Sequence, residues 1–200
     1  MSGEKHNLPD ETSLAQAAQT TVFNSNGERV EFGSIISAKP TIVVFIRHFF
    51  CGDYVAQLSA VRPEALANVD RQLVIIGCGS HQPIAHYQET TSCPFPIYAD
   101  PDRTLYHALG MTIESLARTP VNEERPSYLR KSDFSNALSS IWRGPLKNPS
   151  LIGKQGNISQ LGGEFVFGLG PTCTYASRMQ HTQDHVEVAD LMRAAGVEYP

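Results

Sequence analysis

Cys51 is the residue of this sequence best placed to do chemistry. It lies in the stretch TIVVFIRHFFCGDYVAQL, residues 41–58, with Arg47 four positions and His48 three positions before it. The reactive form of a cysteine is the thiolate, and nearby cations lower the thiol pKa and so raise the thiolate fraction. Arg47 and His48 are therefore candidate catalytic partners of Cys51. A cysteine beside two phenylalanines is also an ordinary core residue, and this alternative stays open.

The neighbouring segments predict that Cys51 lies between a strand and a helix. Residues 41–46 form a continuous apolar run, typical of a strand covered on both faces, and helical periodicity follows over about 53–66. The N–H groups and dipole at the start of a helix favour an anion, which predicts a lowered pKa for Cys51. If the extended conformation persists, Arg47 shares a face with Cys51 and His48 points the other way. Arg47 is then the better placed partner.

The rest of the chain alternates between strand and helix patterns. The predicted strands are 73–76 and 97–99, the helices 83–90, 102–109 and 184–195, and the hairpins 22–23 with 30–32 and 164–167 with 172–177. This order predicts an α/β, thioredoxin-like fold: a central mixed β-sheet flanked by helices, with an inserted helical segment near 111–150. Within that insertion Tyr128, Phe134 and Trp142 have roughly helical spacing. Such a stripe is typical of core residues, and it could also cover a substrate pocket. We expect residues 1–20 to form an N-terminal helical appendage and residues 21–200 a single domain.

Several further residues are candidates for a role at the site. Cys78 follows a neighbouring parallel strand, so it is a possible resolving thiol, or a small residue that the end of a strand requires. Tyr54, Arg178 and His185 are candidates for substrate binding. His181 and His185 are four residues apart, but the predicted helix begins only near residue 184, so we expect no metal there.

Composition excludes several classes of function. The 200 residues are 41% hydrophobic and 18% charged, which is typical of a globular protein. The net charge of −4 gives no reason to expect nucleic acid or an anionic membrane as partner. The N-terminus has no apolar signal segment, and the four cysteines form no CxxC pair, so we expect a cytoplasmic protein with reduced thiols. No dinucleotide or phosphate-binding fingerprint occurs, and we expect no cofactor.

Several segments in order resemble one family. Ile46-Arg47-His48-Phe49-Phe50-Cys51-Gly52 is similar to the active-site segment of AhpC/TSA-type thioredoxin-fold proteins of the peroxiredoxin-like 2 branch, and fungal members in particular. Agreement continues at 75–77, 97–101, 105–106, 109–111, 162–167 and 178–187, so the resemblance covers roughly residues 20–196. It implies a thioredoxin-like fold and thiol-based antioxidant or reductase activity, and the branch includes a reductase of prostaglandin-type endoperoxides.

This sequence departs from the branch at the site itself. Members commonly carry a second cysteine in Phe-Cys-Gly-x-Cys, whereas here Gly52 is followed by Asp53-Tyr54. His48 stands where ordinary peroxiredoxins have threonine. An oxidised thiol must be resolved by another thiol or by an outside reductant, and the usual second thiol is missing.

Three hypotheses follow. The first is a thiol-dependent, single-cysteine oxidoreductase that acts on a peroxide or small organic substrate through Cys51, with glutathione, thioredoxin or Cys78 resolving the product. The second is a repurposed enzyme of specialised-metabolite biosynthesis doing non-redox acid–base chemistry, such as isomerisation, cyclisation or endoperoxide opening, with His48, Tyr54, Arg178 or His185. The third is a non-catalytic pseudoenzyme. A homodimer is compatible with each of them.

Overall fold

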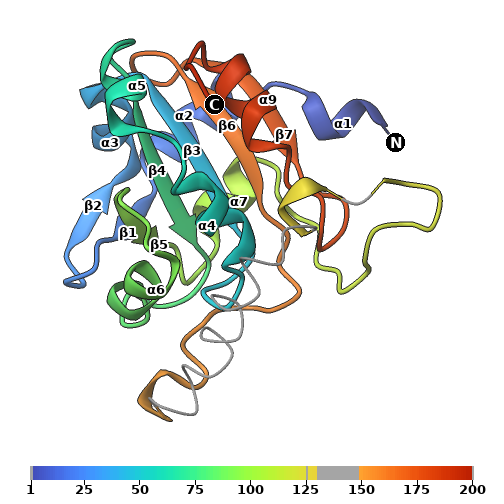
Figure 1. Cartoon of the computed structure of the whole chain (residues 1–200). Helices are drawn as coiled ribbons and strands as arrows, with labels where there is room; N and C mark the ends of the chain where they lie inside the picture. Colours follow the sequence, from blue (N-terminus) through green and yellow to red (C-terminus); the bar gives the residue numbers. More distant parts are fainter. Residues whose placement is uncertain (1, 125, 130–148, 200) are drawn as a thin grey trace.

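The computed structural model describes residues 2–124, 126–129 and 149–199, and its centre is a seven-stranded sheet (Figure 1). The strand order is β2-β1-β5-β4-β3-β6-β7. β3, β4 and β5 are parallel, and the other neighbours pair antiparallel, so the predicted mixed sheet is confirmed. The bounds are β1 (Thr21–Phe23), β2 (Arg29–Glu31), β3 (Thr41–Ile46), β4 (Gln72–Gly77), β5 (Ile97–Ala99), β6 (Gly163–Phe167) and β7 (Cys173–Arg178).

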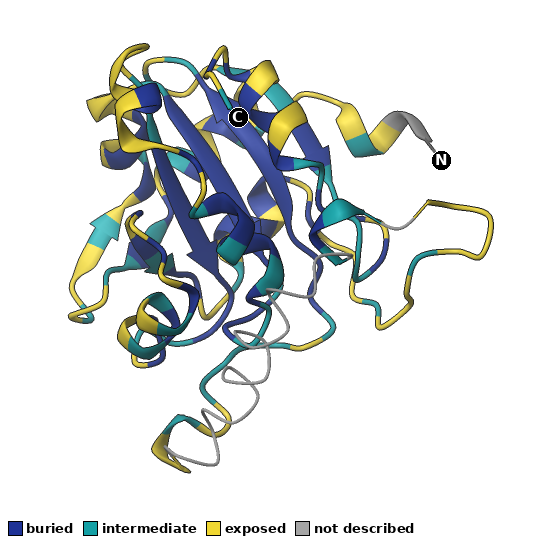
Figure 2. Ribbon diagram, in the orientation of Figure 1, coloured by how far each residue is buried: buried dark blue, intermediate teal, exposed yellow. Residues whose placement is uncertain are grey.

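Helices cover both faces of this sheet. All six residues of β3 are buried, and its side chains alternate between two cores, with Ile42, Val44 and Ile46 in one and Val43 and Phe45 in the other (Figure 2). The first core is completed by α4 (Asp53–Leu58), α5 (Pro63–Ala67), α6 (Ile84–Thr91) and α9 (Val188–Ala194), and the second by α2 (Glu11–Ala18), α3 (Phe32–Ala38) and α7 (Thr104–Ala108). Burial on both faces explains why β3 reads as a continuous apolar run.

Two helix predictions are wrong in their extent. The helix predicted over 53–66 is divided into α4 and α5, because Pro63 has no N–H to donate and so starts a new helix as its first residue. The helix predicted from residue 184 begins only at Val188. Asp184 does not cap it, since its carboxylate accepts the Gln180 N–H at 2.8 Å and pairs with Lys5.

The N-terminal segment and the insertion are described in part. α1 (Ser2–His6) lies beside β7, and α2 packs Leu14 and Ala17 into the second core. The described parts of the insertion hold the short 3-10 turns η1 (Ser127–Leu129) and η3 (Pro149–Leu151). Phe134 and Trp142 lie outside the described residues, so the helix predicted around them stays a prediction.

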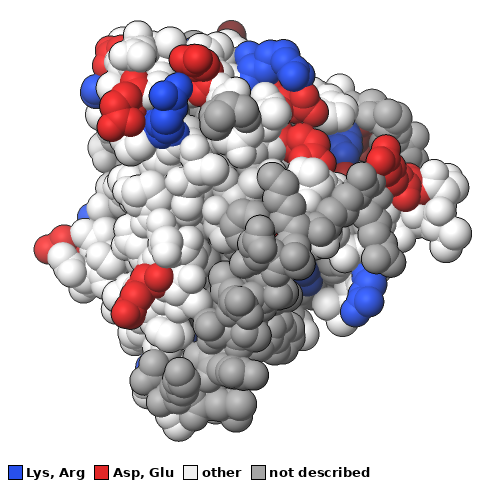
Figure 3. All heavy atoms as spheres, viewed as in Figure 1, with Lys and Arg blue, Asp and Glu red and all other residues white. Residues whose placement is uncertain are grey.

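The described surface is mixed in charge. On the face shown in Figure 3, acidic and basic side chains are interspersed rather than gathered by sign. In the described ranges, every helix is too short or too polar to span a bilayer.

Candidate active site

Cys51 lies in the short connection between β3 and α4. β3 ends at Ile46, and Gly52 is the N-cap residue before the first helical residue of α4. The Cys51 N–H donates to the His48 carbonyl at 3.0 Å, which closes a tight turn. The Tyr87 hydroxyl of α6 donates to the Cys51 carbonyl, so that both backbone polar groups of Cys51 are held. The thiol is thus carried on a turn that is closed by its own hydrogen bond and held by α6.

Two nitrogen atoms approach the Cys51 sulfur. Arg47 Nη1 lies 3.4 Å and His48 Nε2 3.3 Å from Sγ. Arg47 is held in place by a second bond, from Nη2 to the Ile158 carbonyl at 2.6 Å. The prediction that His48 points away from Cys51 is wrong, because the extended conformation stops at Ile46 and the turn brings both side chains to the sulfur.

Hydrogen bonding assigns the proton of the His48 ring. The Phe50 N–H donates to His48 Nδ1 at 3.1 Å, so Nδ1 is the acceptor and carries no proton. Burial, together with the charge of Arg47, lowers the pKa of His48 to about 3, which keeps the ring neutral at physiological pH. A neutral ring that is bare at Nδ1 carries its proton on Nε2. His48 therefore donates to the Cys51 sulfur, as Arg47 does, and does not act as its base.

Burial acts against ionisation of Cys51. It raises the pKa of the thiol to about 11; the Arg47 charge lowers it and the Asp53 carboxylate raises it further. The lowered pKa predicted from sequence is therefore wrong in sign, because the loss of solvation outweighs the favourable charge. At neutral pH the protonated thiol is the resting form.

Alkylation of Cys51 by iodoacetamide is expected to accelerate about tenfold per pH unit between pH 7 and pH 10, because the thiolate fraction below the pKa rises by that factor. His48 is already neutral over this range and adds no step near its ordinary pKa. Peptide mapping of the labelled protein separates Cys51 from the other three thiols. A rate that levels off by pH 8 would show that the pKa is not raised.

A pocket of about 590 Å³ opens at this site. The described residues that line it include the three catalytic candidates Arg47, His48 and Cys51, and the substrate-binding candidates Tyr54 and His185. Five residues chosen from sequence are thus brought to one cavity. Its volume is in the range of pockets that hold small organic molecules.

Arg178 does not line this pocket. Its guanidinium donates to the carbonyls of Leu109, Asn7 and Glu4, at 2.7, 2.8 and 3.2 Å, and it borders a separate cavity of about 340 Å³. Its ring neighbour is Phe165, 5.3 Å from the guanidinium carbon. Arg178 therefore anchors the N-terminal segment to the sheet and does not take part in the Cys51 site.

Cys78 is buried in the second core and faces away from the core that contains Tyr54. Its sulfur donates to the Arg47 carbonyl at 2.8 Å, and burial raises its pKa to about 12. All four cysteines are free thiols. Cys78 thus supports the backbone of Arg47 and is a poor source of thiolate.

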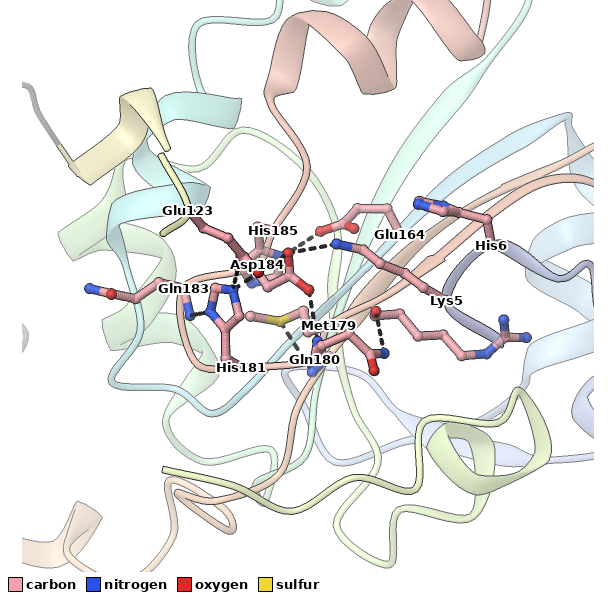
Figure 4. A network of polar contacts seen from close by, with 12 residues as sticks. Lys5, His6, Glu123, Glu164, Met179, Gln180, His181, Gln183, Asp184 and His185 are labelled. Carbon is pink, nitrogen blue, oxygen red and sulfur yellow. Dashed lines mark hydrogen bonds and ion pairs between the residues drawn. The ribbon is translucent and has the colours of Figure 1, made fainter. Parts of the chain in front are cut away.

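Glu164 is a site residue that sequence reasoning missed. It is fully buried in β6 and bonds to His185 Nδ1, as Figure 4 shows. A glutamate inside the apolar strand GEFVF was the signal that could have drawn attention to it. His181, by contrast, pairs with Glu123 at 3.2 Å, and the described residues hold no group of three or more side chains suited to a metal.

Comparisons with known proteins agree with this architecture. The sequence model of a family described as AhpC/TSA antioxidant enzyme matches residues 57–181, a range that begins after Cys51. Peroxiredoxin-like 2C of Mus musculus is 30% identical over 194 residues, covering 92% of this chain and 80% of its own length. The Homo sapiens protein of the same name is 29% identical over 195 residues, with 92% and 81% covered.

Solved structures share the fold. Peroxiredoxin Q of Xanthomonas campestris superimposes with a TM-score of 0.57 at 14% identity, covering 95% of this chain and 90% of its own. A mutant of peroxiredoxin 6 of Arenicola marina gives a TM-score of 0.60 at 11% identity, with 94% and 72% covered. At these identities the likeness shows a thioredoxin-like, peroxiredoxin-type fold.

Proposed function

Since this chain belongs to the AhpC/TSA antioxidant enzyme family, and so to a family of thiol-dependent oxidoreductases, we propose that it works through the single cysteine Cys51 on a peroxide or small organic substrate. The observation that carries this proposal is the pair of N–H donors, from Arg47 and His48, on the Cys51 sulfur at a pocket wall. Two donors stabilise a thiolate and the negative charge that develops as it reacts.

The proposed reaction is a displacement at oxygen. The Cys51 thiolate gives an electron pair to the terminal oxygen of a hydroperoxide, the O–O bond breaks, and the bonding pair leaves with the alkoxide. The alkoxide takes up a proton to become an alcohol, and Cys51 becomes a sulfenic acid. In this step His48 donates a hydrogen bond to the Cys51 sulfur as a neutral group. It stands at the position where ordinary peroxiredoxins have threonine.

An external thiol completes the cycle in this proposal. Cys78 is buried and engaged with the Arg47 carbonyl, so we assign resolution to glutathione or thioredoxin. The first thiol condenses with the sulfenic acid to a mixed disulfide and water, and a second releases Cys51 as a disulfide forms. Four free thiols suit the reducing conditions of the cytoplasm, and a homodimer is compatible with this proposal.

Pocket size favours an organic hydroperoxide over hydrogen peroxide. Hydrogen peroxide is close in size to water, which occupies about 30 Å³ in the liquid. The cavity, at about 590 Å³, is far larger than such a molecule. Aromatic and aliphatic side chains such as Tyr54, Tyr128 and Leu129 contribute to the lining. They provide an apolar surface for an organic group beside the reacting sulfur.

One observation favours the second candidate, non-redox acid–base chemistry on a specialised metabolite. Burial holds the pKa of Cys51 at about 11, so the thiolate is scarce at neutral pH. An enzyme that uses the pocket but not the thiol would tolerate this. The two candidates differ in whether conversion needs the Cys51 sulfur.

Mixing reduced protein with one equivalent of cumene hydroperoxide is expected to consume the peroxide stoichiometrically. The intact mass should rise by one oxygen atom, and dimedone, which replaces the hydroxyl of a sulfenic acid, should label Cys51 in a peptide map. Peroxide loss no faster than in buffer, or oxygen found only on other residues, would rule out the peroxidase proposal.

A further inference from the structure

The proposed reaction leaves one proton to be moved. Cys51 rests as a thiol and the leaving alkoxide needs a proton, so a group in the pocket must take the first and supply the second. His48 cannot do this, because Phe50 N–H occupies Nδ1 and Nε2 already carries a proton directed at the sulfur. Arg47 stays protonated throughout. The remaining candidates among the described residues that line the pocket are Asp53 and His185.

His185 has the geometry for this task. It lines the same pocket as Cys51, and its Nδ1 is bound to the buried carboxylate of Glu164. With Nδ1 so engaged, Nε2 is the nitrogen left for a pocket ligand, and the described residues show no hydrogen bond to it. A carboxyl group on one ring nitrogen fixes the orientation of the ring and leaves the other nitrogen for proton exchange.

Aromatic contacts hold the His185 ring in one orientation. The Tyr54 ring is stacked on it, with centroids 4.2 Å apart and planes 4° from parallel, and Tyr128 meets it edge-on at 6.3 Å. The Tyr128 hydroxyl also accepts the His185 backbone N–H at 3.3 Å. Tyr54 is the second residue of α4, three positions after Cys51. The imidazole is thus fixed next to the segment that carries the thiol.

We propose that His185, oriented by Glu164, is the acid–base group of the Cys51 pocket: it takes the thiol proton and returns it to the leaving oxygen of the peroxide. The sulfur–oxygen bond forms as the O–O bond breaks, the electron pair leaves on the alkoxide, and the proton passes from His185 Nε2 to that oxygen. The ring ends neutral, and Glu164 acts only by positioning it. This inference rests on the proposed peroxide reaction at Cys51.

The burial of Glu164 supports a role beyond structure. A carboxylate with no exposed surface is costly in a strand unless it is paired. Its Oε2 is buried with no hydrogen-bond partner among the described residues, so the packing does not satisfy this group fully. Nearby, the pair His181–Glu123 has a half-exposed carboxylate, and neither residue lines the pocket. That second pair provides a matched control.

The test compares peroxides whose leaving groups differ in basicity. Single-turnover oxidation of Cys51 is measured with tert-butyl hydroperoxide, which releases a strongly basic alkoxide, and with peracetic acid, which releases a weakly basic carboxylate. His185→Gln is expected to slow the first about 100-fold, within the usual contribution of a general acid, and the second less than about threefold. Glu164→Gln should slow the first about tenfold, since a neutral amide holds the ring less firmly than the carboxyl group does. His181→Gln should match the parent.

Iodoacetamide alkylation of Cys51 serves as the internal check, because iodide leaves without a proton. Alkylation needs the thiol proton removed but no proton on the leaving group, so in a folded His185→Gln variant it should slow no more than the peracetic acid reaction does, less than about threefold. Equal slowing of both peroxides and of alkylation would show a structural role and overturn the proposal, as would unchanged rates with both peroxides. A parent protein that reacts with neither peroxide would overturn the proposed function and this inference together.

Discussion

Cys51→Ser is expected to reduce hydroperoxide consumption to the rate of buffer alone, a loss of about a thousandfold or more. The serine hydroxyl is a far weaker nucleophile than a thiolate at any pH the protein tolerates, and it forms no sulfenic acid. Arg47 and His48 would then donate to a neutral oxygen that does not attack. The measurement is peroxide loss after mixing, with intact mass showing that no oxygen is added to the variant.

The matched control is Cys93→Ser. Cys93 is buried, its sulfur lies 3.8 Å from the Phe95 carbonyl, and it does not line the Cys51 pocket. This variant should consume peroxide as the parent does. Conversion of a pocket substrate that survives Cys51→Ser but not His185→Gln would favour the non-redox candidate.

Arg47→Met is expected to slow single-turnover oxidation of Cys51 about 100- to 1000-fold, the range found for loss of one charged or oxyanion-stabilising donor. The variant loses the 3.4 Å contact to the sulfur and the positive charge that partly offsets burial. The pKa of Cys51 should therefore rise further. At fixed pH, iodoacetamide alkylation should slow in parallel with the peroxide reaction.

Arg47→Lys separates charge from geometry. An ammonium keeps the charge, but it does not reproduce the planar fork that bonds both the Cys51 sulfur and the Ile158 carbonyl, so an intermediate rate is expected. Arg193→Met is the control, because Arg193 is exposed on α9 and pairs with Asp190. An Arg47→Met protein as fast as the parent would remove Arg47 from the mechanism.

Local patterns determined most of the fold. The apolar runs at 41–46 and 73–76 form the central parallel strands. A strand whose two faces are both covered by helices needs apolar side chains at every position, so a continuous apolar run predicts it. Gly27, with φ +80°, lies in the turn that joins the two strands of the first hairpin, β1 and β2. The same patterns predicted that Cys51 lies between a strand and a helix. That position depends only on the order of the segments along the chain.

Tertiary structure decided what the site residues do. His48 reaches the sulfur only because a turn ends the strand alternation at Ile46, and Arg178 is withdrawn by carbonyls far from it in sequence. The sign of the Cys51 pKa shift depends on how much surrounding chain excludes water, which no spacing of residues specifies. The Glu164–His185 pair joins β6 to the loop before α9, across 21 residues of sequence. Sequence by itself therefore determined the family and the position of the thiol, whereas desolvation and long-range contacts decided its protonation state and its partners.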